Sequence, residues 1–110
     1  MSDFELQEGE TLLQNVTANL FQGRVALGGR LFVTDKRLFF RPHRFNCVRT
    51  PTEIPLAQVS FLWKCNTYFL IPNGMMVQMR SGVNCQFVVW RRDRLISVIR
   101  ENLRGSVTVE

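Results

Sequence analysis

Apolar and polar residues alternate with a period of two along most of this chain, which is typical of β-strands with one buried face. The first such stretch is residues 11–21, where the apolar side chains fall on even positions: Leu12, Val16, Ala18 and Leu20. We expect this strand to end at Gln22-Gly23, because glycine commonly interrupts regular structure.

Residues 30–41 carry the clearest hairpin signal, with a two-residue turn at Asp35-Lys36. Such a turn places Leu31 opposite Phe40 and Val33 opposite Leu38 on the side that we assign to the core. The other side is then an outward stripe of aromatic side chains bracketed by arginines: Arg30 opposite Arg41, Phe32 opposite Phe39, and Thr34 opposite Arg37. We interpret Gly28-Gly29 as the entry to this hairpin or as a bulge.

Several shorter stretches predict the remaining strands. Pro55 places one of them at a sheet edge, because proline has no amide hydrogen to donate to a neighbouring strand. Asn73-Gly74 is a strong signal for a tight hairpin turn, and Arg80-Ser81-Gly82 predicts another turn. We expect these strands at residues 53–56, 59–65, 68–72, 75–79 and 84–90.

The period changes at Trp90 and becomes that of an amphipathic helix, which Gly105 ends. The apolar stripe of this helix consists of Leu95, Ile96, Ile99 and Leu103. In so short a chain the sheet is the only element that it can pack against. We interpret the arginines of this region as the solvated side of the helix: Arg91, Arg92, Arg94, Arg100 and Arg104. The pattern therefore predicts a mostly-β domain of about seven strands and one C-terminal helix.

A length of 110 residues fits one domain over 1–110, with its core at about 8–104. No apolar run reaches the roughly 20 residues of a membrane-spanning helix, and the acidic start does not resemble a secretory signal. We therefore expect a cytoplasmic protein. If it associates with a membrane, we expect it to do so as a peripheral protein. The three cysteines, Cys47, Cys65 and Cys85, suit reduced thiols better than disulfides or a metal site.

Charge is distributed unevenly around a net value of +5. Residues 1–23 carry −4, whereas residues 24–49 carry +6. A local basic excess can attract anionic lipids, nucleic acid or an acidic protein. The alternative is that the acidic N-terminal residues pair with it.

The stretch from Gly28 to Phe40, which reads GGRLFVTDKRLFF, resembles the signature of GRAM domains. Glu8-Gly9-Glu10, Glu53-Ile54-Pro55-Leu56 and Phe87-Val88-Val89 agree with this family in order, so the resemblance covers residues 8–103. It implies a pleckstrin-homology-like (PH-like) fold, an orthogonal two-sheet β-sandwich or barrel of about seven antiparallel strands capped by one C-terminal helix. The stand-alone chain is most similar to small bacterial proteins of this type, for which the phosphoinositide targeting of eukaryotic relatives is not implied.

The pattern favours a binding module and not an enzyme. The acidic residues beyond the N-terminal block are isolated in the sequence, so no acid–base pair is indicated. His43 and Cys47 are better interpreted as unrelated loop residues than as a catalytic pair, and Gly28-Gly29 lacks the partners of a phosphate-binding loop. We expect no cofactor.

The basic and aromatic stripe of the hairpin is the candidate ligand-binding surface. Arginines facing each other on neighbouring strands are unfavourable unless an anion lies between them, and basic residues near an anionic bilayer contribute about 1 kcal/mol each. The alternative is that another part of the chain or a second subunit covers the two phenylalanines. The candidate residues, for an anionic membrane lipid or a protein partner, are Arg30, Phe32, Lys36, Arg37, Phe39, Arg41 and Arg44.

A rival hypothesis is a homo-oligomer without a lipid ligand, because the chain offers more apolar residues than a small sandwich buries. Trp63 and the methionines 75, 76 and 79 are further apolar residues for such an interface, although we interpret the methionines first as core filling. We interpret Trp63 and Trp90 as core or rim anchors. The sequence argues against nucleic acid as a partner, because no recognised RNA- or DNA-binding motif is present.

Overall fold

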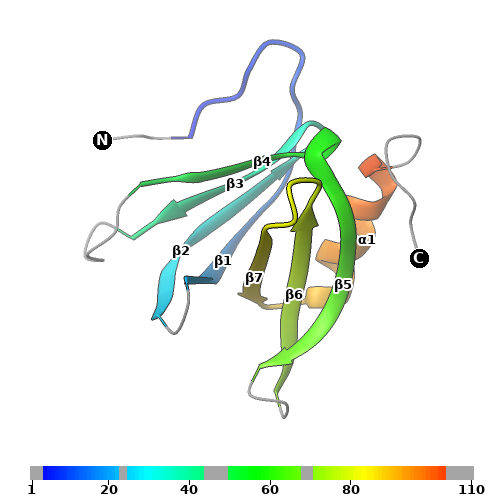
Figure 1. Cartoon of the computed structure of the whole chain (residues 1–110). Coiled ribbons are helices and arrows are strands. Elements are labelled where there is room, and N and C mark those ends of the chain that lie inside the picture. Colours follow the sequence, from blue (N-terminus) through cyan, green and yellow to red (C-terminus); the bar gives the residue numbers. More distant parts are fainter. Residues whose placement is uncertain (1–3, 23–24, 44–49, 68–70, 104–110) are drawn as a thin grey trace.

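The structure is a computed structural model that describes residues 4–22, 25–43, 50–67 and 71–103. In these residues the chain forms seven antiparallel strands and one α-helix (Figure 1). The strands are hydrogen-bonded in the order β4-β3-β2-β1-β7-β6-β5. Their bounds are β1 Leu12–Gln22, β2 Val25–Thr34, β3 Arg37–Pro42, β4 Thr52–Pro55, β5 Val59–Thr67, β6 Ile71–Met79 and β7 Asn84–Val89. A 3-10 turn, η1 (Leu56–Gln58), follows β4, and the helix α1 spans Arg92–Leu103.

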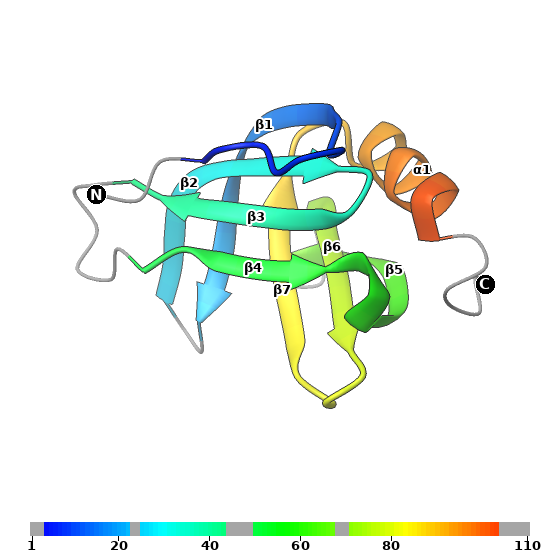
Figure 2. The ribbon, with the colours of Figure 1, turned by 90° about the horizontal axis from the view of Figure 1, so that it is seen from above.

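Strand β1 joins the two halves of the sheet, because it pairs with β2 on one side and with β7 on the other. The mostly-β fold with one C-terminal helix is thereby confirmed. The two layers expected from the sequence are halves of a single curled sheet, β1–β4 and β5–β7, whose strands cross in the view of Figure 2. Strand β4, which contains Pro55, lies at one edge as predicted.

The core lies on the concave side of the curled sheet and contains the predicted inner face of the hairpin. Leu31 pairs with Phe40 and Val33 pairs with Leu38, and none of the four side chains is more than 1% exposed. Phe40 contacts Phe87 of β7 with ring centroids 6.0 Å apart, which ties the two halves together. The hairpin register expected from the sequence is therefore confirmed.

Helix α1 buries the predicted stripe, Leu95, Ile96, Ile99 and Leu103, against this core. Its packing partners are β5, β6 and η1, so it lies beside the edge strand β5 (Figures 1 and 2). None of the helices in the described part of the chain is long and apolar enough to span a membrane.

Two arginines of the helix are not solvated as the sequence predicts. Arg92 Nη1 donates to the carbonyl of Cys65 at 2.8 Å, and Arg100 Nη2 donates to that of Leu62 at 3.5 Å. Both side chains are half-buried, because carbonyls of the edge strand β5 are within their reach. Arg91 and Arg94 are exposed as predicted, whereas Arg104 and Gly105 lie outside the described residues.

The turn predicted at Asn73-Gly74 is wrong, because both residues lie inside β6. Gly74 pairs with Cys65 on β5 and with Val88 on β7. A Cβ atom at Gly74 would lie 2.5 Å from Cys65 Sγ and 2.7 Å from its carbonyl oxygen. The glycine serves a close approach of strands, and the connection from β5 to β6 falls at residues 68–70, outside the described part.

Gly28 and Gly29 also lie inside a strand, since β2 begins at Val25 and not at the hairpin that the sequence indicated. A Cβ atom at Gly29 would overlap the carbonyl oxygen of Arg41 and lie 2.9 Å from the Cα atom of Pro42. At Gly28 the nearest atom would be Oδ1 of Asn19, at 3.3 Å, on a side chain that can move. Gly29 is therefore required by the backbone of β3.

We expect Gly29→Ala to destabilise the fold by about 2 kcal/mol or more, because its methyl group would meet backbone atoms that cannot move away. Gly28→Ala is the matched control, and its effect should stay within about 1 kcal/mol because only a side chain must shift. Urea unfolding of both variants measures the difference. Equal unfolding midpoints would contradict the steric role of Gly29.

Candidate functional site

The chain before β1 runs over the outer face of β2, as the view from above shows (Figure 2), and it contacts β3 through Phe39. The Phe4 ring stacks on Phe32 with centroids 4.4 Å apart and lies 5.3 Å from Phe39. Phe32 is consequently only 6% exposed. The two phenylalanines lie on the predicted side of the hairpin, but residues 4–10, which we call the N-terminal strap, cover them.

Arg37 is buried beneath the strap, although it belongs to the predicted basic stripe. Its guanidinium binds both carboxylate oxygens of Glu10, Nε to Oε2 at 2.8 Å and Nη2 to Oε1 at 3.1 Å. Nη1 donates to Glu53 at 3.0 Å, and Nη2 also donates to the carbonyl of Glu5 at 2.7 Å. The whole side chain is thus engaged within the chain.

Glu10 is the acidic partner that this arrangement needs, and its side chain is fully buried. Its carboxylate accepts a hydrogen bond from the Thr34 hydroxyl at 2.6 Å and another from the backbone amide of Gln7 at 2.8 Å. Hydrogen bonding to Arg37, opposed by desolvation, lowers the pKa of Glu10 from 4.5 to about 2. The same contact raises the pKa of Arg37.

The strap therefore answers the question that the uneven charge left open: the acidic N-terminal residues pair with the basic stretch through Glu10 and Arg37. Sequence reasoning did not single out Phe4 or Glu10 as parts of this site. The signal available was the opposite charge of the two blocks, which indicates that they attract but not which residues meet. The partners are 27 positions apart in the sequence, beyond any local pattern.

Arg30 and Arg41 face each other on neighbouring strands, as predicted. The exposed Arg30 donates from Nε to Oδ1 of Asn15 at 2.7 Å and from Nη1 to Thr17 at 3.4 Å. The Arg41 guanidinium lies over the Phe32 ring, 5.2 Å from its centroid. Two guanidinium groups are thus oriented on the outer face beside the strap, which we call the arginine pair.

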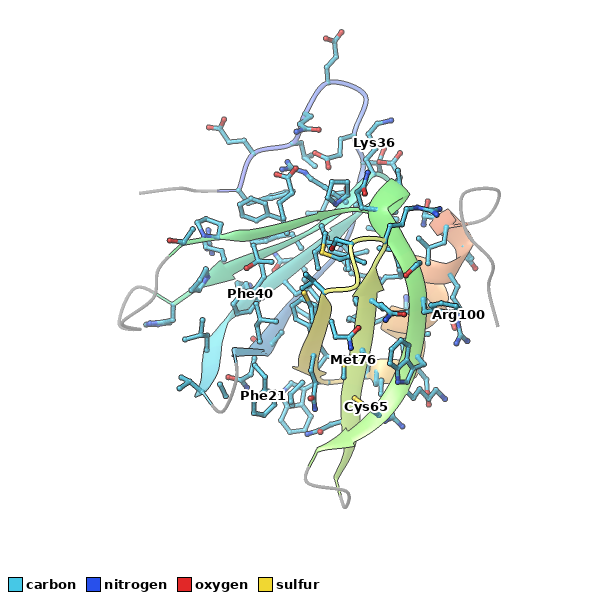
Figure 3. The ribbon with its side chains drawn as sticks, in the orientation of Figure 1. Phe21, Lys36, Phe40, Cys65, Met76 and Arg100 are labelled. Carbon is cyan, nitrogen blue, oxygen red and sulfur yellow. The ribbon has the colours of Figure 1, made fainter. Side chains whose placement is uncertain are left out.

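Lys36 is exposed but lies apart from the arginine pair, at the turn where β3 begins (Figure 3). Arg41 is five residues further along that strand, which corresponds to about 17 Å. Arg44 lies outside the described residues. Of the seven predicted residues, the structure pairs the exposed Arg30 with the half-buried Arg41 across β2 and β3. It places Phe32, Arg37 and Phe39 against the strap.

The sequence matches the GRAM domain family over residues 1–104. The chain belongs to the GRAM domain family. This agrees with the hairpin at 28–40 that carried the resemblance. A comparison with curated protein sequences gives no match.

Solved structures similar to this GRAM domain include PH domains, in agreement with the expected PH-like fold. A C-terminal domain of an unknown protein from Leishmania infantum has a TM-score of 0.75 at 20% identity, over 87% of this chain and 86% of that chain. The Vps36 N-terminal PH domain has a TM-score of 0.69 at 16% identity, over 92% and 84%. A Slm1 PH domain in complex with inositol-4-phosphate has a TM-score of 0.61 at 11% identity, over 89% and 98%.

The remaining chemistry-bearing side chains of this GRAM domain are dispersed. In the described ranges, no group of three or more His, Cys, Asp or Glu residues is placed to hold a metal ion. Cys65 and Cys85 are half-buried free thiols, and burial raises the pKa of each. Cys47 lies outside the described residues, so its predicted independence from His43 stays a prediction.

The tryptophans and methionines divide between core and surface. Met75 is fully buried, as core filling predicts, whereas Met76 and Met79 are half-buried. Trp63 is 37% exposed at the rim, but Trp90 is 76% exposed, so its predicted role as an anchor is wrong. Trp90 directly follows β7, where Arg91 adopts a positive φ of 56° and the chain turns into α1.

We expect Glu10→Gln to lower the free energy of unfolding by about 3 kcal/mol at neutral pH, because it removes the charge that compensates the buried Arg37. The folded-state pKa of Glu10 is depressed, so its contribution is complete above pH 4.5 and is lost as the pH falls toward about 2. The gap between wild type and variant should therefore shrink on acidification.

Denaturant unfolding across a pH series measures this gap. Glu8→Gln is the matched control, because Glu8 lies in the same strap but is exposed, and its effect should stay below about 0.5 kcal/mol. A gap between wild type and Glu10→Gln that stays constant down to acidic pH would show that the carboxylate charge is not what stabilises the strap.

Proposed function

We propose that this GRAM domain is a non-catalytic binding module that attaches to anionic membrane surfaces through the arginine pair. The carrying observation is that Arg30 and Arg41 are neighbours across two strands on the outer face. Guanidinium groups bind phosphate and carboxylate oxygens with charge-assisted hydrogen bonds. Arg30 is held in place by Asn15 and Thr17, so its guanidinium is preorganised for an anion.

The charge of the chain supports an anionic partner. The net charge is +5, and residues 24–49 alone contribute +6. Arg44 belongs to the same basic stretch of the sequence and would add to its attraction for an anion, whereas Lys36 would act only through the long-range field. Phe32, Phe39 and Arg37 would support the arginine pair from beneath the strap and not touch the ligand.

The structural relatives support a phosphate-bearing ligand. One of them, the Slm1 PH domain, was solved with inositol-4-phosphate. A membrane lipid headgroup presents the same chemistry, and guanidinium groups bind phosphate oxygens with charge-assisted hydrogen bonds. The protein would then be cytoplasmic and peripheral to a membrane. An acidic protein partner is the alternative that the experiment below separates.

We expect Arg30→Glu combined with Arg41→Glu to weaken binding to phosphatidylserine-containing vesicles at least roughly thirty-fold, from about 1 kcal/mol for each lost basic residue. Co-sedimentation at low salt measures the effect, with phosphatidylcholine vesicles as the uncharged reference. Binding should also weaken as salt is added, because exposed charges are screened.

Lys36→Glu combined with Arg94→Glu is the control with the same change in net charge. Both residues are exposed, one at the β2–β3 turn and one on α1, so this variant should retain most of the binding. Equal losses in the two double variants would mean that net charge alone acts. If the wild type does not bind anionic vesicles, the membrane proposal fails, and an acidic protein remains the partner to seek.

A further inference from the structure

The outer face of β1, β7, β6 and β5 has a composition unlike that of the strap-covered half. Along these strands, side chains at alternate positions point into the core. The side chains that alternate with them therefore point to the opposite side of the sheet, toward solvent. The strand register aligns this outer set in three rows: Phe61, Gln78 and Asn84; Trp63, Met76, Gln86 and Phe21; and Cys65, Gly74, Val88 and Asn19. We call these eleven residues the charge-free face.

No residue of this described set carries a charge, although 21% of the residues in the chain are charged. The same fraction would give two charged residues among eleven, and the solvent side of an antiparallel sheet ordinarily carries more. The opposite half differs, because its outer side contains Arg30, Arg37, Arg41 and Glu53.

Large apolar side chains occupy much of the charge-free face and remain in contact with solvent. Phe61 is 45% exposed and Trp63 is 37% exposed, and the two lie on the edge strand β5. Met76 and Phe21 are half-buried in the same row as Trp63, on β6 and β1. Figure 3 labels Phe21, Met76 and Cys65 on three strands of this face, in the lower half of the view and away from the strap.

We propose that the charge-free face is the contact surface for a second copy of this chain. Enrichment in aromatic residues and methionine with depletion of charge is the composition of the buried centre of protein interfaces. An anionic membrane, a nucleic acid or an acidic protein would be recognised by basic residues, which this face lacks. The net charge of +5 makes two copies repel, and contact through uncharged side chains keeps that repulsion smallest.

The polar residues of the face also suit contact with an identical surface. Asn19, Asn84, Gln78 and Gln86 carry amide groups, each with both a hydrogen-bond donor and an acceptor. In a two-fold symmetric contact each surface meets a copy of itself, so every group needs a partner that the same surface contains. Amides satisfy this condition among themselves, whereas a carboxylate or a guanidinium would need a partner of opposite charge on the same surface.

The size of the face sets the expected strength. Eleven residues are about half of the roughly 20–30 residues per side of a standard stable interface. We therefore expect a reversible dimer with a dissociation constant in the micromolar range or weaker. This surface is separate from the arginine pair, so self-association and membrane binding are independent of each other.

Sedimentation velocity over a series of protein concentrations tests the proposal. The wild type should shift from monomer to dimer as concentration rises, and Trp63→Glu should weaken association at least about thirty-fold, because interface tryptophans are commonly worth 2 kcal/mol or more. Phe61→Lys on the same face is a second variant, and its exposure of 45% should make it well tolerated by the fold. Circular dichroism checks that both variants are folded.

Val83→Glu is the matched control, because Val83 is 54% exposed but lies in the β6–β7 connection, outside the charge-free face. It should dimerise like the wild type. A wild type that stays monomeric at the highest concentration, folded face variants that dimerise normally, or an equal loss in Val83→Glu would each overturn the proposal.

Salt distinguishes this contact from the binding proposed for the arginine pair. Added salt should leave the dimer intact or strengthen it, since no ion pair holds it and the repulsion between copies is screened. Vesicle binding should weaken under the same conditions. Arg30→Glu with Arg41→Glu should lose vesicle binding and keep the dimer, so failure of either proposal can be recognised without the other. A dimer that dissociates as salt is added would contradict the charge-free contact.

Discussion

The ion pair between Glu10 and Arg37 is the contact on which the arrangement of the outer surface depends. Two buried opposite charges are stable only if each satisfies the other with good geometry. The bidentate contact does so, and Thr34, Glu53 and the carbonyl of Glu5 complete its hydrogen bonds. The pair fixes the strap at the point where it enters β1, and Phe4 then reaches the aromatic rings of β2 and β3.

The strap gives the two halves of the curled sheet different surfaces. On β2 and β3 it covers the aromatic rings and neutralises one arginine, which leaves the arginine pair beside it. The described residues of the strap do not reach β5, β6 or β7. There Phe61 and Trp63 stay in contact with solvent. One small domain therefore presents a basic surface and a charge-free surface, which suit partners of different chemistry.

Local patterns in the sequence predicted most of the fold. The hairpin around Asp35-Lys36, the edge strand with Pro55 and the helix stripe from Leu95 to Leu103 each follow from the spacing of apolar residues over a short window. The turn at Asn73-Gly74 failed because glycine serves two needs that look identical in sequence. It allows tight turns, and it also lets strands approach closely, as Gly74 does beside Cys65.

By itself the sequence determined most of the strands, the helix, the hairpin register and the side of the sheet that each hairpin residue faces, because these depend on neighbours within a few positions. It also placed Arg30 opposite Arg41. Only the tertiary structure decided which outward residues stay exposed. Phe32 and Arg37 are covered by Phe4 and Glu10, and such long-range pairs depend on the path of the whole chain. For the same reason, no local pattern could show that four strands share one uncharged face.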